Sequence, residues 1–268
     1  MKNFLSCSTH SYHGYPLERA LEGIAASGLK FVELGAIPGH TEHVSPENML
    51  SKDVNALKKL LSDNGLTATS ISGHCDMAKK DGLALFMKRL ELAESMSIKY
   101  INTAKGSVDS KESEEAFYAN MREAANYNKE LIICLETHGG LLGTSAIAKK
   151  TLEVIGCENV KINYDPANLI FFNDKRPEDD ITDAVTLIGH FHIKDKLEGP
   201  GVWNFPEIGT GNIDFSKLFS VLKDAGYDGP LSFELEFDGN PSATPEFVDN
   251  ALKNSANYVK SVAASIGW

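Results

Sequence analysis

Short runs of apolar and β-branched residues recur along the chain, separated by longer segments in which apolar positions have helical spacing. In segments 17–25 and 54–61, for example, leucine, isoleucine and valine stand three or four residues apart, which is typical of amphipathic helices. Strands that alternate with helices in this way predict βαβ units and a parallel sheet. The eight candidate strands are Phe4–Cys7, Phe31–Leu34, Thr67–Ile71, Tyr100–Thr103, Leu131–Glu136, Val160–Tyr164, His190–Ile193 and Leu231–Leu235.

Helix ends are marked by glycine and by capping residues. Gly28, Gly65 and Gly226 each stand between a helical segment and the next strand, where a helix commonly ends. We expect one helix to begin at Pro46, after a serine N-cap, and another to be capped by Asp214. These boundaries support the division into repeated strand-helix units.

The whole chain, 1–268, contains no linker or low-complexity tract, so we expect one domain. Eight strand-helix units in 268 residues, 42% of them apolar, predict an α/β fold of the (β/α)8 TIM-barrel type. The net charge of −11 argues against nucleic acid as a partner, because phosphate backbones are bound chiefly by Lys and Arg. No stretch approaches 18 apolar residues, and the first residues lack the apolar core of a secretory signal. We therefore expect a cytoplasmic protein without membrane contact.

Polar residues gather where the predicted strands end. TIM-barrel enzymes carry their chemistry at the C-terminal ends of the strands, so a ring of polar side chains there predicts a solvent-filled pocket. One such residue alone would mean little, since loops begin at these positions. The ring consists of Thr9, His10, Glu33, His74, Lys105, Glu136, His138, Asp165, Asn168, His192, Lys194, Asp195, Glu234 and Glu236.

Four members of this ring form a candidate metal site: Glu136, Asp165, His192 and Glu234, at intervals of 29, 27 and 42 residues. Each interval is about one strand-helix unit of a barrel, which runs roughly 30 residues, so the four side chains should converge. Strand alternation places His192 and Lys194 on the inward face. Carboxylates with one imidazole suit a single Mn²⁺, Mg²⁺, Co²⁺ or Zn²⁺ ion.

Several motifs resemble the sugar phosphate isomerase/epimerase superfamily, the xylose-isomerase-like barrels. They are ISGHCDM, LETHGG, NYDPANLI, GHFHIKD, IGTGNIDF and GYDGPLSFELE. The resemblance implies one divalent metal held by the same four ligands. It also implies a small sugar as substrate and allows a homo-oligomer. The chain differs from the superfamily's ketose 3-epimerases in having Leu142 and Glu198 where those enzymes have glutamate and arginine, and Asn168 where they have histidine.

The ligand set predicts chemistry next to a carbonyl. A divalent ion polarises a hydroxy-ketone, and Glu136 or Glu234 can remove the neighbouring proton as general base. His138 and Lys194 are expected to shuttle protons or to hold the developing oxyanion; an ion pair with a nearby carboxylate is the alternative for each. We therefore predict a metal-dependent isomerase or epimerase of a keto-sugar or sugar phosphate.

Substrate contacts are expected from His10, His74, Lys105, Asn168 and Trp203. Aromatic residues near the mouth can stack on a sugar ring, or they can be a lid's own packing or a subunit contact. The segment Gly209–Gly211 is interpreted as a plain turn rather than a phosphate site. The other aromatic candidates are Phe171, Phe172, Tyr12 and Tyr15.

Three alternatives to an isomerase or epimerase remain open from sequence. A lyase or dehydratase would use the same enolate to expel a β-substituent, as on an inosose or a 3-keto-glycoside. A sugar-binding barrel without a metal and without catalysis is the second. A phosphodiesterase acting on abasic DNA is the third, and the negative charge disfavours it.

Overall fold

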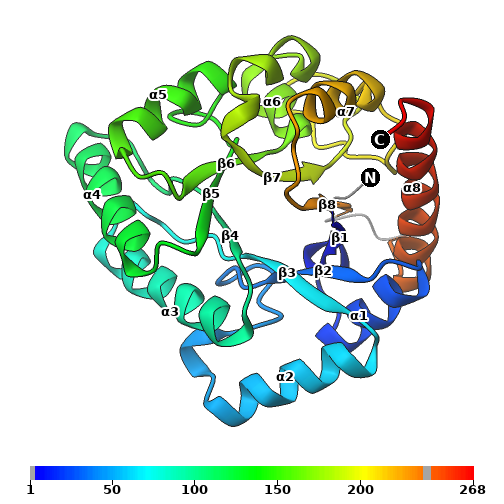
Figure 1. Cartoon of the computed structure of the whole chain (residues 1–268), viewed down its shortest axis with the longest axis horizontal. Helices are drawn as coiled ribbons and strands as arrows, with labels where there is room; N and C mark the ends of the chain where they lie inside the picture. The colour runs from blue at the N-terminus through cyan, green and yellow to red at the C-terminus, as the bar shows by residue number, and fades with distance from the viewer. Residues whose placement is uncertain (1–3, 238–242) are drawn as a thin grey trace.

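Eight parallel strands form a closed barrel in the computed structural model, which describes residues 4–237 and 243–268 (Figure 1). Each strand pairs with the next one along the chain, and β8 pairs with β1, so the predicted barrel is confirmed. The strands are β1 (Leu5–Ser8), β2 (Phe31–Gly35), β3 (Thr67–Ser72), β4 (Tyr100–Thr103), β5 (Ile132–Glu136), β6 (Val160–Tyr164), β7 (Ile188–Ile193) and β8 (Leu231–Phe233).

Helices surround this barrel on the outside, and α1 packs beside α8, which closes the ring (Figure 1). In the part of the chain that the structure describes, none of them combines the length and apolar character needed to cross a bilayer. The helices are α1 (Leu17–Ala26), α2 (Ser51–Asp63), α3 (Lys80–Met96), α4 (Lys111–Tyr127), α5 (Ser145–Ile155), α6 (Pro166–Asn173), α7 (Phe215–Asp224) and α8 (Pro245–Ser265). Short 3-10 helices are η1 (Thr9–Tyr12), η2 (Pro46–Asn48), η3 (Pro177–Asp179), η4 (Ile181–Asp183) and η5 (Val185–Leu187).

The expected helix ends are largely confirmed. Gly28, Gly65 and Gly226 follow α1, α2 and α7 with φ of 82°, 64° and 73°, a region that glycine adopts without a steric cost. Asp214 caps α7, because its carboxylate accepts a hydrogen bond of 3.0 Å from the backbone N–H of Lys217.

The prediction that an α-helix begins at Pro46 is wrong. Only the 3-10 helix η2 begins there, and α2 begins at Ser51. The Ser45 hydroxyl donates to the carboxylate of Glu42 at 2.8 Å and makes no capping hydrogen bond. Because the Ser45 hydroxyl bonds to Glu42, it does not cap a helix as the prediction required.

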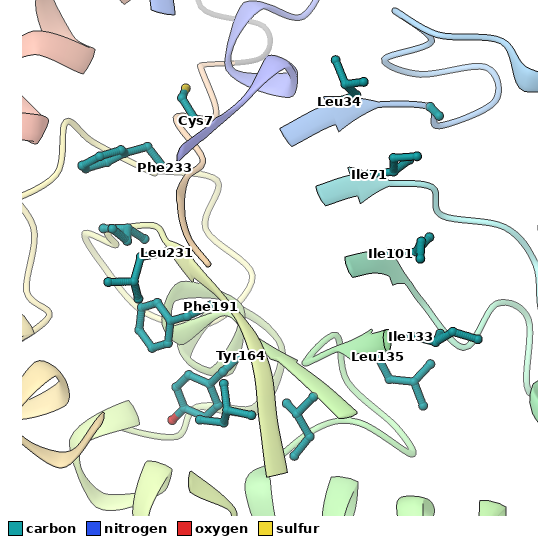
Figure 2. Close-up of a cluster of buried hydrophobic side chains, with 14 of the residues drawn as sticks. Cys7, Leu34, Ile71, Ile101, Ile133, Leu135, Tyr164, Phe191, Leu231 and Phe233 are labelled. Carbon is teal, nitrogen blue, oxygen red and sulfur yellow. The ribbon is translucent and has the colours of Figure 1, made fainter. Parts of the chain in front are cut away.

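Apolar side chains of the strands point outward from the barrel and form the core beneath the helices. Figure 2 shows Ile71, Ile101 and Ile133 on one side of the barrel and Phe191 and Phe233 on the other, all directed away from its centre. Alternation along each strand produces this arrangement, since neighbouring residues face opposite sides.

The inside of the barrel is polar, whereas TIM barrels usually fill this space with branched aliphatic residues. Because these inward side chains are small or able to form hydrogen bonds, they leave room for larger charged groups above them and can support those groups from below. The fully or almost fully buried inward residues include Ser6, Glu33, Ser70, Ser72, Asn102, Asn163, His190 and Ser232.

Candidate active site

The four predicted metal ligands meet at the mouth of the barrel. Glu136 is the last residue of β5, Asp165 and Glu234 directly follow β6 and β8, and His192 lies in β7. Each offers a ligand atom, and these atoms all lie within 4.8 Å of one another. Parallel strands bring their carboxyl ends to one rim, which explains why residues so distant in sequence converge.

Asp165 shows most clearly that the site fits a cation. One carboxylate oxygen, Oδ1, caps α6 by accepting the backbone N–H groups of Ala167 (2.9 Å) and Asn168 (3.0 Å). The other, Oδ2, is buried without a hydrogen-bond partner, 3.8 Å from His192 Nδ1. Leaving a buried carboxylate oxygen without a hydrogen bond costs free energy, which a cation among these ligands would offset.

His192 Nδ1 faces the other ligands, at 3.4 Å from Glu234 Oε2 and 3.8 Å from Glu136 Oε2. Hard carboxylate oxygens with one imidazole nitrogen form a set that Mn²⁺, Mg²⁺, Co²⁺ or Zn²⁺ accepts. Of the residues present, Glu136, Asp165, His192 and Glu234 therefore fit one divalent ion.

Charge balance favours the same interpretation. Five buried carboxyl groups lie close to two groups whose pKa is raised, Lys194 and His192, so acidic side chains outnumber these two cations. A dication would add positive charge where the carboxylates converge. The five carboxylates belong to Glu33, Glu136, Asp165, Glu234 and Glu236.

The pKa values of the ligands reflect these mutual contacts. Burial alone would lower the pKa of His192, but the charges of Glu234 and Glu33 raise it well above its usual value. Burial would raise the pKa of Glu136, but His74 and His192 lower it to about 2. A metal ion bound by His192 would have to compete with the proton that this raised pKa favours.

Lys194 forms ion pairs instead of standing free as a base. Its ammonium group contacts the carboxylate of Glu236 and lies 3.2 Å from Glu234 Oε2 and 3.7 Å from Asp165 Oδ2. Burial opposes its charge, but these carboxylates, Glu236 foremost, hold the pKa well above the usual lysine value. Of the alternatives raised by the sequence, the geometry favours the ion pair, with the ammonium as a fixed positive charge.

Polar side chains surround the two glutamates on the cavity side. His74 Nε2 lies 2.9 Å from Glu136 Oε2, and the Asn168 amide donates to Glu136 Oε1 at 2.8 Å. His10 Nδ1 lies 3.3 Å from Glu234 Oε1 in the same manner. Each glutamate is therefore held in place by a neighbouring imidazole.

His138 differs from these histidines because an aromatic ring is its main neighbour. Its ring lies 4.3 Å from that of Phe172, and burial lowers its pKa. A neutral imidazole at the cavity wall can donate or accept one hydrogen bond on each nitrogen, which suits contact with a hydroxyl group.

A cavity of about 260 Å³ opens above the ligands. One wall is aromatic: Phe171, Phe172, Trp203 and Phe205 meet with ring centroids 4.7 to 5.7 Å apart. The opposite side carries imidazoles and carboxylates, so the cavity has one apolar and one polar face. Its lining is His10, Ile37, His40, His74, Glu136, His138, Asn168, Phe171, Phe172, Lys194, Trp203, Phe205, Glu234 and Glu236.

Some sequence-predicted positions fall outside this cavity. Lys105 does not line it, and its ammonium group donates to the carbonyl of Gly106 in its own loop at 3.2 Å. Tyr12 is buried below, where its hydroxyl donates to Asp249 of α8 at 2.7 Å. Tyr15 likewise donates to the carbonyl of Ala243. These contacts direct both side chains toward α8 and the segment before it, and neither tyrosine lines the cavity.

The segment Gly209–Gly211 is a turn closed by a carboxylate of the protein itself. The backbone N–H groups of Gly209 and Gly211 both donate to Asp195 Oδ2 at 2.9 Å. Amides that already bind this carboxylate are not open to a phosphate group, in agreement with the sequence interpretation.

Three lining residues had not been singled out from sequence. Ile37 and His40 lie in the loop after β2, which an isolated bridge between Ala36 and Glu42 folds back on itself. Phe205 lies in the loop after β7. No pattern of spacing marks these positions, because the course of a loop depends on its tertiary contacts.

Comparison with known proteins places the chain in a family. Over 183 residues it is 28% identical to hydroxypyruvate isomerase of Escherichia coli K12, a match that covers 62% of this chain and 64% of that one. Over 138 residues it is 31% identical to L-ribulose 3-epimerase of Mesorhizobium japonicum, covering 50% and 40% of the two chains. The chain thus spans less than two thirds of the length of either relative.

A solved structure shows the same fold over nearly the whole length. It is a xylose isomerase-like TIM barrel protein from Mycobacterium smegmatis in complex with magnesium, with a TM-score of 0.78, 14% identity and coverage of 98% and 97%. The profile of the family described as xylose isomerase-like TIM barrel matches residues 21–260. This protein therefore belongs to the xylose isomerase-like TIM barrel family.

Proposed function

We propose that the protein is a divalent-metal-dependent isomerase or epimerase that moves a proton on the carbon next to the carbonyl of a small keto-sugar. The observation that carries the proposal is the pair Glu136 and Glu234. Both are metal-ligand candidates, both line the cavity, and they enter it from β5 and from the end of β8, three strands apart around the barrel. Two bases on different sides of one substrate suit inversion of a carbon centre, and either base alone suffices for proton transfer between neighbouring carbons.

Glu136, Asp165, His192 and Glu234 would hold the ion. When bound, it supplies a Lewis acid that polarises the carbonyl group and stabilises negative charge on the oxygens of the substrate. The carboxylates of Glu136 and Glu234 are ionised, so either can accept the proton from carbon. Return of the proton to the opposite face inverts the centre, and return to the neighbouring carbon isomerises the sugar.

Other residues would bind and orient the substrate. The charged ammonium of Lys194 is placed to stabilise an oxyanion, and the neutral His138 to hydrogen-bond a hydroxyl group. The aromatic wall that includes Trp203 offers an apolar face against the C–H side of a sugar and excludes water from the reacting carbon.

The lining favours a keto-sugar without a phosphate group. Among the described residues that form the cavity there is no arginine, and the single lysine, Lys194, is already paired with carboxylates. A phosphate would bring about two further negative charges to a site with a surplus of them.

The names of the relatives agree with this reaction class. One is an isomerase of hydroxypyruvate and the other an epimerase of L-ribulose, and both names describe small hydroxy-carbonyl compounds. The positions at which the sequence departs from the ketose 3-epimerases give no substitute contact: Leu142 is fully buried and Glu198 lies outside the cavity lining. Substrate contacts should therefore differ from those of that branch.

The test is a panel of keto-sugars and keto-sugar phosphates incubated in D₂O with protein loaded with Mn²⁺, beside the same protein treated with a chelator. Deuterium in a rearranged sugar, seen only with metal, supports the proposal. Loss of water or of an aglycone would instead assign the lyase alternative. Metal-loaded protein that incorporates no deuterium into any panel member, alongside a productive reference isomerase, would contradict the proposal.

A further inference from the structure

A second buried group of side chains lies against the metal ligands, deeper in the barrel. It consists of Glu33 on β2 and His190 and His192 on β7, all with no exposed surface. Glu33 Oε1 lies 3.2 Å from His192 Nε2, and Glu33 Oε2 lies 3.3 Å from His190 Nε2. A charged glutamate inside a barrel needs polar or charged partners, because burying an unpaired carboxylate costs free energy.

The two nitrogens of His192 face opposite partners. Nε2 points to Glu33, whereas Nδ1 points to the carboxylates of Glu136, Asp165 and Glu234 at the mouth. An ionised carboxylate can only accept a hydrogen bond, so Nε2 must carry the hydrogen. In the neutral ring, the lone pair is then on Nδ1, the nitrogen that faces the ligand set. Asn163 lies 3.4 Å from both nitrogens and does not discriminate between them.

Glu33 is itself held firmly by the polar interior. The Asn102 amide donates to its Oε1 at 3.0 Å. His190, its other neighbour, is fixed by Asn163 Oδ1 at 2.9 Å and by Ser70 Oγ at 3.1 Å. Together with Glu33, these polar residues inside the barrel form a hydrogen-bonded support below His192, contributed by five different strands.

A second metal ion does not suit this position. Both nitrogens of His190 already have partners in the protein, and Asn102 occupies the oxygen of Glu33 that faces His192. A metal here would also take the same His192 that the ligand set at the mouth uses. Glu33 Oε2 makes no hydrogen bond, but it lies 3.3 Å from His190 Nε2, so an imidazole already occupies the position beside it.

We propose that Glu33 is a positioning residue of the metal centre: it fixes the tautomer and the ring orientation of His192, so that Nδ1 is presented to the divalent ion, and its charge raises the basicity of that nitrogen. Carboxylates behind metal-binding histidines act in this way, and their loss typically costs about 10- to 100-fold in metal affinity. The inference rests on the proposed function only in requiring that a divalent ion binds at the mouth.

The first test uses the unmodified protein. We expect ¹⁵N spectra of histidine-labelled protein to show, on addition of diamagnetic Zn²⁺, that His192 keeps its proton on Nε2 and coordinates through Nδ1. The His192→Gln variant identifies the signals. Coordination through Nε2 would overturn the inference, whatever the variants of Glu33 do.

The second test compares Mn²⁺ affinities measured by calorimetry. Glu33→Gln retains an oxygen that can accept from Nε2 but removes the charge, so its affinity should fall about 10-fold, and Glu33→Leu, which removes both, should fall about 100-fold. Ser6→Ala, which alters the same interior at a hydroxyl that donates to the carbonyl of Leu231 at 3.5 Å, should bind Mn²⁺ as the unmodified protein does. If Glu33→Leu does not fold, the isosteric Glu33→Gln and the spectra decide.

The outcomes separate this inference from the proposed function. A lower melting temperature of Glu33→Gln with unchanged Mn²⁺ affinity and an unchanged His192 tautomer would mean a merely structural role and would overturn the inference, even if deuterium enters the sugar. Weakened Mn²⁺ binding in the Glu33 variants, with no deuterium in any sugar of the panel, would support the inference while removing the proposed reaction.

Discussion

Glu234→Gln tests the metal site most sharply, because the structure predicts a small effect on the metal-free protein and a large effect on metal binding. Burial would raise the pKa of Glu234, but His192 and Lys194 hold it well below its usual value, so its charge stabilises the metal-free protein and its neutralisation removes part of that stabilisation. The two cations beside it keep other partners: His192 retains Glu33, and Lys194 retains Glu236. We therefore expect the free energy of unfolding of the metal-free protein to change by about 1 kcal/mol or less.

Metal binding should respond much more strongly. Loss of a direct ligand costs more than loss of an outer partner, so we expect the Mn²⁺ affinity of Glu234→Gln to fall at least about 100-fold. With Mn²⁺ at about 1,000 times the original Kd, the stabilisation by metal falls from about 4.1 to about 1.4 kcal/mol. At about 2 to 4 °C per kcal/mol, the rise in melting temperature caused by Mn²⁺ should shrink by about 5 to 11 °C.

The assay is thermal unfolding with and without Mn²⁺, with Glu236→Gln as the matched control. Glu236 stands two residues further on, is buried to a similar extent and contacts Lys194, but it lies outside the ligand set. Its variant should keep most of the rise caused by Mn²⁺. Turnover of Glu234→Gln should fall about 10²- to 10⁴-fold through loss of the base. An unchanged Mn²⁺ effect in Glu234→Gln, or the larger loss in Glu236→Gln, would refute the reasoning.

Four further outcomes follow from other contacts. Phe191→Ala, in the core between β7 and α7, should lose about 3 to 5 kcal/mol in urea unfolding; less than 1 kcal/mol would show that this core is not tightly packed. Gly211→Ala places a methyl group 2.2 Å from an oxygen of Asp195, so its melting temperature should drop, and an unchanged value would contradict the turn described above. Lys196→Met removes hydrogen bonds to the carbonyls of the loop that carries the aromatic wall and should raise the substrate KM while leaving Mn²⁺ affinity unchanged. The raised pKa of His192 means that its charge stabilises the metal-free protein fully below the unfolded pKa, about 6.5, and that this stabilisation is lost as pH rises through the folded pKa. Melting curves should therefore show a rise in melting temperature caused by Mn²⁺ that grows over this pH interval. A rise that does not depend on pH would contradict the prediction.

The pattern of hydrophobic residues predicted the barrel because the signal is local. A buried strand needs only four to six residues of suitable type, and each of the eight runs coincides with a strand to within a few residues at its ends. The error at Pro46 arose from Ser45, whose hydroxyl turned to Glu42 instead of capping a helix. Such a choice between two nearby partners depends on loop geometry that spacing does not encode.

The convergence of the four candidate ligands was predictable, because the strand rule converts sequence position into spatial position. Asp165 and Glu234 follow directly on their strands, so the rim of the barrel brings them together. Lys105 followed the same rule and yet lies outside the cavity, because its flexible side chain bends back to Gly106. Loop residues such as His40 were not predictable, as their position is set by tertiary contacts.

The position of Glu33 was predictable from sequence only in part. Its inward orientation follows from alternation along β2, but its partner His192 lies on β7, which does not neighbour β2 in the sheet. Contacts across the interior of a barrel depend on the tilt and stagger of all eight strands. The sequence therefore indicates a polar interior without indicating which side chains meet.

The central claim is that one divalent ion is bound at the mouth by side chains from β5 to β8. Anomalous diffraction from crystals grown with Mn²⁺ measures this directly. We predict one peak per chain, with oxygens of Glu136, Asp165 and Glu234 and Nδ1 of His192 at about 2.0 to 2.6 Å. A peak elsewhere, or none among these four residues at saturating Mn²⁺, would contradict it.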